Sequence, residues 1–222
     1  MMKNRVVFLA CFVAPFLTTA TAQTLDDLFQ PSSTKITWLG IDYSHVKLIG
    51  SFSNFNETTK ITPEIIKNDY FVRWNDLIIK EKNKYTVDKM FRTKALIYSI
   101  EGVTSINAQT DLTTIEQSAT PNYTESQLQQ FVKNYFFNQQ EGIGILFLAE
   151  SLNKEQEEAT YHLLVLNLST NEILLHDNFT TKPGGFGLRN YWASSYLKVI
   201  ETIRDHKYGA YKKNFLRSKK SK

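Results

Sequence analysis

The sequence predicts an α/β fold: a single three-layer domain in which helices flank both faces of a mixed sheet of about five strands. Two observations lead to it. Strand-like and helix-like segments follow in the order strand, helix, strand, helix, three strands, helix. Residues 142–149 are an almost continuous apolar run, typical of a strand that is buried on both faces. An α+β arrangement, with the helices on one face only, is the alternative.

The first half of this order rests on three segments. Residues 36–41 and 95–100 are apolar runs that predict strands. Between them, Thr62 and Pro63 give the N-cap and the first position of a helix, and its apolar face extends to about residue 80. Strands separated by a helix favour parallel pairing.

The second half starts with the clearest local signal. Thr124-Glu125-Ser126-Gln127 is a capping box, and apolar residues then repeat at helical spacing from Leu128. Three apolar runs follow with short connections, so they predict an antiparallel meander: residues 142–149, 160–167 and 172–179. A helix over residues 188–206 completes the domain.

Residues 1–22 have the layout of a secretory signal peptide. Two cations precede an apolar run over residues 6–17, and Ala20-Thr21-Ala22 supplies the small-residue cleavage site. The run is shorter than the roughly 20 residues of a membrane span. The sequence therefore predicts an exported chain that begins at Gln23, without a transmembrane segment, in the periplasm or outside the cell.

The exported chain of 200 residues is long enough for one well-filled core. Its composition excludes disulfides and cysteine chemistry, because the only cysteine, Cys11, lies in the leader. Cys11 also allows a second interpretation as a lipoprotein anchor. Only about five apolar residues precede it, so the ordinary signal peptide is favoured.

Positive charge is concentrated at the carboxyl end. The net charge of +4 includes two cations of the leader and seven in residues 207–222, so residues 23–206 carry a net charge of −5. We therefore divide the chain into the leader, one domain over 23–206 and a basic tail. The tail is either a frayed end or a peripheral contact with an anionic membrane. The acidic domain has no basic groove, so a nucleic-acid partner is not expected.

A glycine-rich turn before the last helix is the best candidate binding site. It comprises Lys182, Gly184, Gly185, Gly187 and Arg189. Free N–H groups at a helix start, next to two cations, favour a carboxylate, phosphate or sulfate. Alternatively, the glycines only allow the chain to turn sharply. The turn lacks the ending of a phosphate-binding Walker loop.

Titratable residues at strand ends give weaker signals. Four acids each follow an apolar strand: Asp42, Glu101, Glu150 and Asp177. Gathered at one edge, they could hold a divalent cation, but antiparallel strands would scatter them. His162 and His176 flank one predicted hairpin and can face each other across it. No zinc or serine-hydrolase motif is present, so we assign no catalytic residue, no metal ligand and no cofactor.

Three segments carry a resemblance to known proteins: residues 37–44 (TWLGIDYS), 147–154 (FLAESLNK) and 184–192 (GGFGLRNYW). In them the chain resembles a family of exported proteins of unknown activity from Bacteroidetes-type bacteria. The resemblance implies an envelope or secreted protein with one domain and brings no site residue. The layout is also similar to small α/β domains of envelope assembly proteins, such as the amino-terminal domain of TolB or CsgG-like domains, a likeness of fold alone.

The sequence thus favours a non-catalytic binding domain whose partner is a protein or a small anionic ligand. A hydrolase that uses carboxylates or a divalent metal ion is the alternative.

Overall fold

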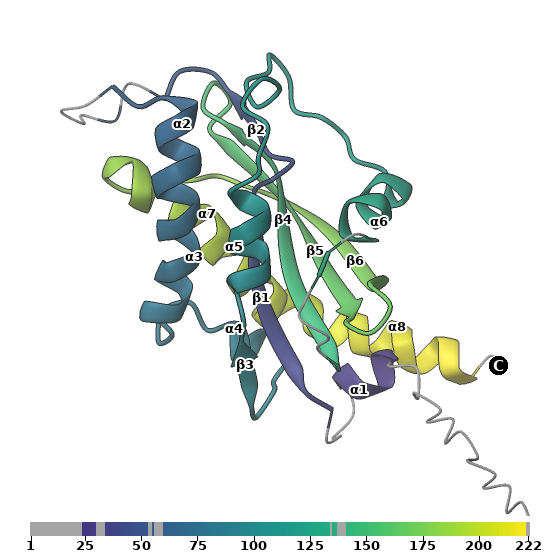
Figure 1. Ribbon diagram of the computed structural model, residues 1–222. Coiled ribbons are helices and arrows are strands. Elements are labelled where there is room, and N and C mark those ends of the chain that lie inside the picture. The colour runs from purple at the N-terminus through teal and green to yellow at the C-terminus, as the bar shows by residue number, and fades with distance from the viewer. Residues whose placement is uncertain are drawn as a thin grey trace, which may run out of the picture.

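The computed structural model describes residues 24–29, 34–52, 55, 60–133, 135–136 and 141–220. The predicted leader lies outside the described residues. Within them the chain forms a single α/β domain, built on one mixed sheet with helices on both sides (Figure 1). The predicted fold class is confirmed.

The sheet joins a parallel half to an antiparallel half. Its strands lie in the order β3-β1-β4-β5-β6, and β2 pairs with β4 past the end of β1. β1 runs parallel to β3 and β4, whereas β4, β5 and β6 form the predicted antiparallel meander. The bounds are β1 (Ile36–Asp42), β2 (Lys47–Ile49), β3 (Leu96–Tyr98), β4 (Ile143–Asn153), β5 (Glu158–Asn167) and β6 (Glu172–Thr181).

Three groups of helices surround the sheet. The first comprises α1 (Leu25–Phe29), α2 (Pro63–Ile65), the π-helical turn η1 (Ile66–Tyr70), α3 (Phe71–Lys80) and α4 (Val87–Met90). The second comprises α5 (Glu101–Asn107) and α6 (Glu125–Lys133), and the last α7 (Gly187–Thr202), the π-helical turn η2 (Ile203–Lys207) and α8 (Tyr208–Lys220). The helix predicted from Thr62 forms, and Thr62 Oγ1 accepts a hydrogen bond from Ile65 N at 3.3 Å. α5 was not predicted.

Two hydrophobic cores separate the three layers. The larger core lies between one face of the sheet and helices α3 and α7, and it includes Trp38, Trp74 and Trp192. The smaller core lies on the other face, where Val103 of α5 and Leu128 of α6 cover a row of leucines from β4 and β5. Figure 1 shows α5 in front of the sheet and α7 behind it. Helices therefore cover both faces, and the alternative with one covered face is wrong.

Buried amides fix the end of β1, where the site described below begins. The register of β1 against β4 shifts between Trp38 and Gly40, and Gly40 has φ +108°. This shift makes room for the Asn75 side chain, which accepts from Ile41 N at 2.6 Å and donates to Ile41 O at 2.9 Å. A Cβ on Gly40 would approach Asn75 Oδ1 to 2.6 Å. From α5, Asn107 accepts from Tyr43 N at 2.6 Å.

The basic segment continues the last helix. Through η2 the chain stays helical into α8, which ends at Lys220. Tyr208 is buried against Phe29 and Phe91, with ring centroids 5.9 and 6.4 Å apart. Aromatic packing therefore attaches α8 to the domain, which the charge of the segment did not indicate.

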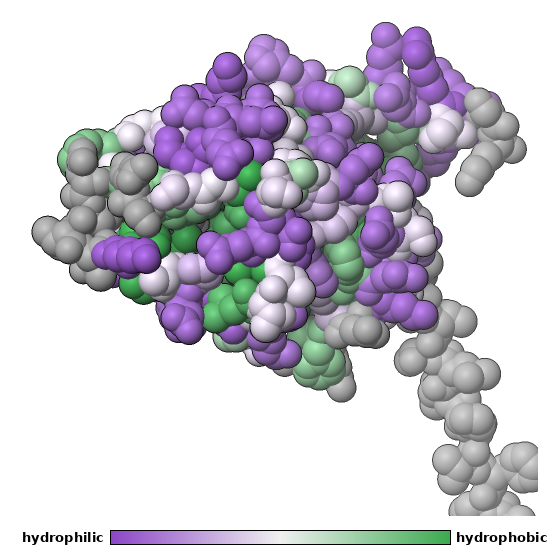
Figure 2. Space-filling view, turned by 90° about the horizontal axis from the view of Figure 1, so that it is seen from above, coloured by the Kyte–Doolittle hydropathy of each residue, from purple (hydrophilic) through white to green (hydrophobic). Residues whose placement is uncertain are grey.

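The visible surface is mostly polar. Figure 2, a view from above, shows hydrophilic side chains with hydrophobic ones appearing between them. Large exposed hydrophobic residues among those described are scattered over several elements: Val72, Ile97, Phe136, Phe186 and Leu216. No helix within the described part of the chain has the length and apolar character to cross a membrane.

Candidate functional site

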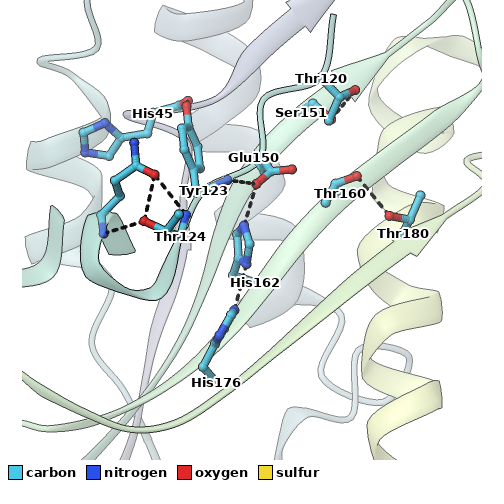
Figure 3. Close-up of polar contacts among 11 residues, drawn as sticks. His45, Thr120, Tyr123, Thr124, Glu150, Ser151, Thr160, His162, His176 and Thr180 are labelled. Atoms are coloured by element: carbon cyan, nitrogen blue, oxygen red, sulfur yellow. Dashed lines mark hydrogen bonds and ion pairs between the residues drawn. The ribbon is translucent and has the colours of Figure 1, made fainter. Parts of the chain in front are cut away.

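A chain of polar side chains runs from the buried centre of the sheet to its surface. It starts at Glu150 on β4, passes through His162 on β5 and reaches His176 on β6 (Figure 3). Glu150 and His162 are almost completely buried, with 3% and 1% of their surfaces exposed, whereas His176 is partly exposed. The three strands of the meander each contribute one residue, so the sheet itself holds these hydrogen-bonded side chains in place.

Strand alternation puts Glu150 and His162 on the same face. Leu146, Leu148 and Glu150 follow at a spacing of two along β4, and Leu148 lies opposite His162 in the pairing with β5. The two polar residues therefore extend the leucine row of the smaller core. The register shifts at Glu150, between Ala149 and Ser151, as in a β-bulge.

Hydrogen bonds decide which histidine nitrogens carry protons. Glu150 Oε2 lies 2.8 Å from His162 Nε2 and accepts from Tyr123 N at 3.0 Å. A carboxylate can only accept, so His162 Nε2 is the donor. While His162 is neutral, its Nδ1 is then an acceptor for His176 Nε2, 2.9 Å away, and His176 Nδ1 is an acceptor at the surface.

A hollow of about 410 Å³ opens between α6 and β6, next to His176. Its lining includes Glu125, Gln129 and His176, together with the apolar residues 173–175. Glu125 Oε1 lies 3.6 Å from His176 Nδ1. Burial lowers the pKa of His176, and the neighbouring His162 lowers it further, against an opposing effect of Glu125. At neutral pH the hollow therefore presents two acceptors, an uncharged imidazole and a carboxylate.

The capping box holds the α6 wall of the hollow. Gln127 N donates to Thr124 Oγ1 at 3.3 Å, and Thr124 N donates to Gln127 Oε1 at 2.9 Å, the reciprocal pair predicted from the sequence. Gln129 then joins α6 to the start of β6, since its Oε1 accepts from Ile173 N at 3.0 Å. The helix is thus fixed at its start and against the strand.

A second buried acid lies on the same face. Asp42, at the end of β1, accepts a hydrogen bond from the hydroxyl of Tyr135 and another from Ser44 N at 2.7 Å. Tyr123 lies near both acids: burial raises its pKa to about 12, and Glu150 and Asp42 add to the increase. Its hydroxyl donates to His45 O at 2.7 Å. Both carboxylate oxygens of Asp42 are thus hydrogen-bonded within the protein, which suits a structural role.

The other two acids lie elsewhere. Glu101 starts α5, where it accepts from Ser99 Oγ at 3.1 Å. Asp177 points to the helices of the larger core, where Lys207 and Tyr211 bind it at 3.0 and 2.6 Å. The four strand-end acids therefore do not gather, although β1, β3, β4 and β6 all run in the same direction, because Asp177 lies on the opposite face of the sheet and Glu101 belongs to α5. Within the part of the chain that the structure describes, no group of three or more His, Cys, Asp or Glu residues could hold a metal ion.

The glycine-rich turn folds back on the start of α7. Gly184 N donates to Ser194 Oγ at 2.6 Å and to Tyr191 O at 3.2 Å, so protein groups occupy this N–H. Gly185 and Gly187 have φ of +109° and +74°, values that L side chains rarely adopt. The exposed Arg189 donates to Asn190 Oδ1 at 3.2 Å, while Lys182 lines a different hollow with Lys198. The anion site predicted for this turn stays a prediction.

Sequence reasoning identified the histidine pair but not its link to Glu150. The alternation that places Glu150 beyond Leu146 and Leu148 was available and would have found it.

No protein-family model, curated protein or solved structure matches the chain.

Proposed function

We propose that this protein is a binding domain of the bacterial envelope or the secreted space, which takes a ligand bearing an amine or hydroxyl group between α6 and β6. One observation carries the proposal: His176 Nδ1 and the Glu125 carboxylate lie 3.6 Å apart at the surface end of a hydrogen-bonded chain. A ligand group that donates hydrogen bonds can bind both of these acceptors at once. An ammonium group also matches the charge of Glu125.

Apolar residues beside these acceptors suggest the rest of the ligand. Residues 173–175 of β6 belong to the lining, and its volume lies within the range of small-molecule sites. A short apolar group that carries an amine therefore fits the hollow better than a strongly hydrated ion.

Burial of Glu150 and His162 behind His176 supports a functional role for these hydrogen-bonded side chains. Two almost fully buried polar residues stabilise a fold no better than well-packed apolar residues of similar size. Their arrangement does, however, fix the tautomer and the orientation of His176. Polar networks that end in a hollow are candidate functional sites for this reason.

The test uses three small probes of equal length: n-butylamine, n-butanol and sodium butyrate. Each is titrated at neutral pH into ¹⁵N-labelled protein while amide NMR signals are followed. We expect butylamine, and more weakly butanol, to move the signals of residues 125–129 and 173–176 at millimolar concentrations. Butyrate should leave them in place, and a response to butyrate alone would contradict the proposal.

Variants separate the site from general charge effects. Glu125→Gln and His176→Gln should each weaken the butylamine response several-fold, because the first removes the negative charge and the second the imidazole nitrogen. Glu172→Gln is the matched control: it removes an exposed acid from the same strand, outside the lining. An equal loss in all three variants would show that butylamine only screens negative charge.

A second candidate function rests on the same histidine. A buried carboxylate that orients one imidazole, which in turn orients another at a hollow, is also an arrangement suited to general-base catalysis. In this candidate the reactive group is His176, whereas the hydrolase suggested by the sequence used clustered carboxylates. Hydrolysis of p-nitrophenyl acetate faster than by free imidazole, lost in His176→Gln and kept in Glu172→Gln, would favour the enzyme.

A further inference from the structure

Residues of α1, β3 and α8, with the segment that leads into β3, form a cationic surface, and these elements lie at the lower end of the molecule in Figure 1. A hollow of about 600 Å³ opens there, with Phe29 and Phe91 among the apolar residues of its lining. Four cations belong to the same lining: Lys35, Arg92, Lys94 and Lys212. Arg92 lies over the ring of Tyr208, 4.6 Å from its centroid, and so joins this hollow to α8.

The outer face of α8 extends the positive surface. A shallower hollow of about 350 Å³ follows the helix and is lined by Lys212, Lys213 and Leu216, among others. α8 contains no acidic residue. Two aliphatic side chains are unusually exposed near these cations: Leu216 of α8, at 40%, and Ile97 of the edge strand β3, at 45%.

Little negative charge offsets these cations. Among the described residues, no carboxylate lies within ion-pair distance of Lys35, Arg92, Lys94, Lys212 or Lys213. The nearest acids belong to α1: Asp26 pairs with Lys219 at 2.7 Å, and Asp27 is one acid beside the four cations of the lining.

We propose that this surface, formed by α8 and the hollow beside β3, docks the protein on an anionic phospholipid bilayer. The cations suit phosphate headgroups, and the exposed Leu216 and Ile97 suit the edge of the acyl region. Residues 23–206 carry a net charge of −5, so the same bilayer repels the rest of the body and orients the molecule with α8 towards the membrane. This surface shares no lining residue with the α6/β6 hollow.

The experiment is co-sedimentation of the chain from Gln23, which holds every described element. It is mixed with vesicles of phosphatidylcholine alone and with vesicles that also contain phosphatidylglycerol. Binding is expected only with phosphatidylglycerol and should weaken as sodium chloride is added. Equal binding to both vesicles, or none to either, would overturn the proposal.

Paired variants locate the contact. Lys94→Gln/Lys212→Gln should lower the partition coefficient by on the order of tenfold, since each cation near an anionic surface contributes several-fold. Lys60→Gln/Arg73→Gln removes two exposed cations from another side of the molecule and should have little effect. An equal loss in both pairs would mean that net charge alone drives binding, and the assigned surface would be wrong.

The aliphatic residues decide between a bilayer and any other polyanion. Ile97→Ser/Leu216→Ser keeps every charge and should also lower the partition coefficient several-fold. If this variant binds undiminished, and polyphosphate competes fully with the vesicles, the partner is a polyanion and the bilayer assignment is wrong. Circular dichroism of each variant verifies that the fold is retained.

Discussion

At the scale of single residues, Asn75 holds the end of β1 together with Asn107. It is buried, it bonds both backbone groups of Ile41, and it also donates to Phe71 O at 3.1 Å. In Asn75→Ala the N–H of Ile41 loses its acceptor, whereas Ile41 O keeps a bond from Asn107 at 3.0 Å. We expect the free energy of unfolding to fall by about 1–3 kcal/mol, measured by urea denaturation.

The control for this prediction is Asn83→Ala, which truncates an exposed asparagine after α3. It should change stability by less than about 0.5 kcal/mol. Similar losses in the two variants would show that Ile41 N finds another partner, and that the amide is dispensable.

Two histidines make stability depend on pH. Burial lowers the pKa of His45 and of His176 below the ordinary value of 6.5, and His162 adds to the effect at His176. The unfolded chain therefore binds protons at a higher pH than the folded chain. Stability, full above about pH 7, should decrease as the pH falls through about 6.5 towards the lowered values.

Urea denaturation at a series of pH values measures this effect. His176→Gln should flatten the decrease between about pH 7 and pH 5, because it removes one of the two groups. His206→Gln, a change at an exposed histidine of η2, serves as the control. A wild-type profile that is flat over this range would contradict the prediction.

At the scale of elements, α6 depends on its capping box because the helix has only nine residues. Thr124→Ala removes the acceptor for Gln127 N and should cost about 1 kcal/mol of stability. It should also weaken butylamine binding, since Glu125 lies in the first turn. Gln130→Ala, at an exposed position of the same helix outside the lining of the hollow, is the control in both measurements, and an equal effect there would refute the capping argument.

Elements with a strong local signal were predictable, and those that depend on context were not. The capping box, the apolar run of β4 and the Thr62–Pro63 start each carry their own information in the sequence. α5 does not, because its seven residues directly follow a strand-like run. The hydrogen bonds that help to hold this helix are tertiary contacts, made by the buried Asn107 with the end of β1. For the site, periodicity could place Glu150 beside His162, but the role of Glu125 depends on how α6 lies against β6.

At the scale of the whole molecule, the boundary of the domain is open to a direct test. Charge alone separates residues 207–222 from the body, yet Tyr208 is buried there and Phe215 lies 5.6 Å from Phe29 between ring centroids. Tyr211 also donates to Asp177 at 2.6 Å. Ending the chain after His206 removes these contacts and should lower the free energy of unfolding by about 3–5 kcal/mol, as for the loss of one large core aromatic residue.

Ending the chain after Arg217 instead separates packing from charge. This truncation removes the exposed Lys219–Asp26 pair, worth at most about 1 kcal/mol, and leaves Tyr208, Tyr211 and Phe215 in place. Its thermal midpoint should therefore stay close to that of the longer chain, while its affinity for anionic vesicles should fall with the lost lysines. If the truncation after His206 were equally stable, the aromatic contacts of α8 would contribute nothing, and the domain would end where its charge changes sign.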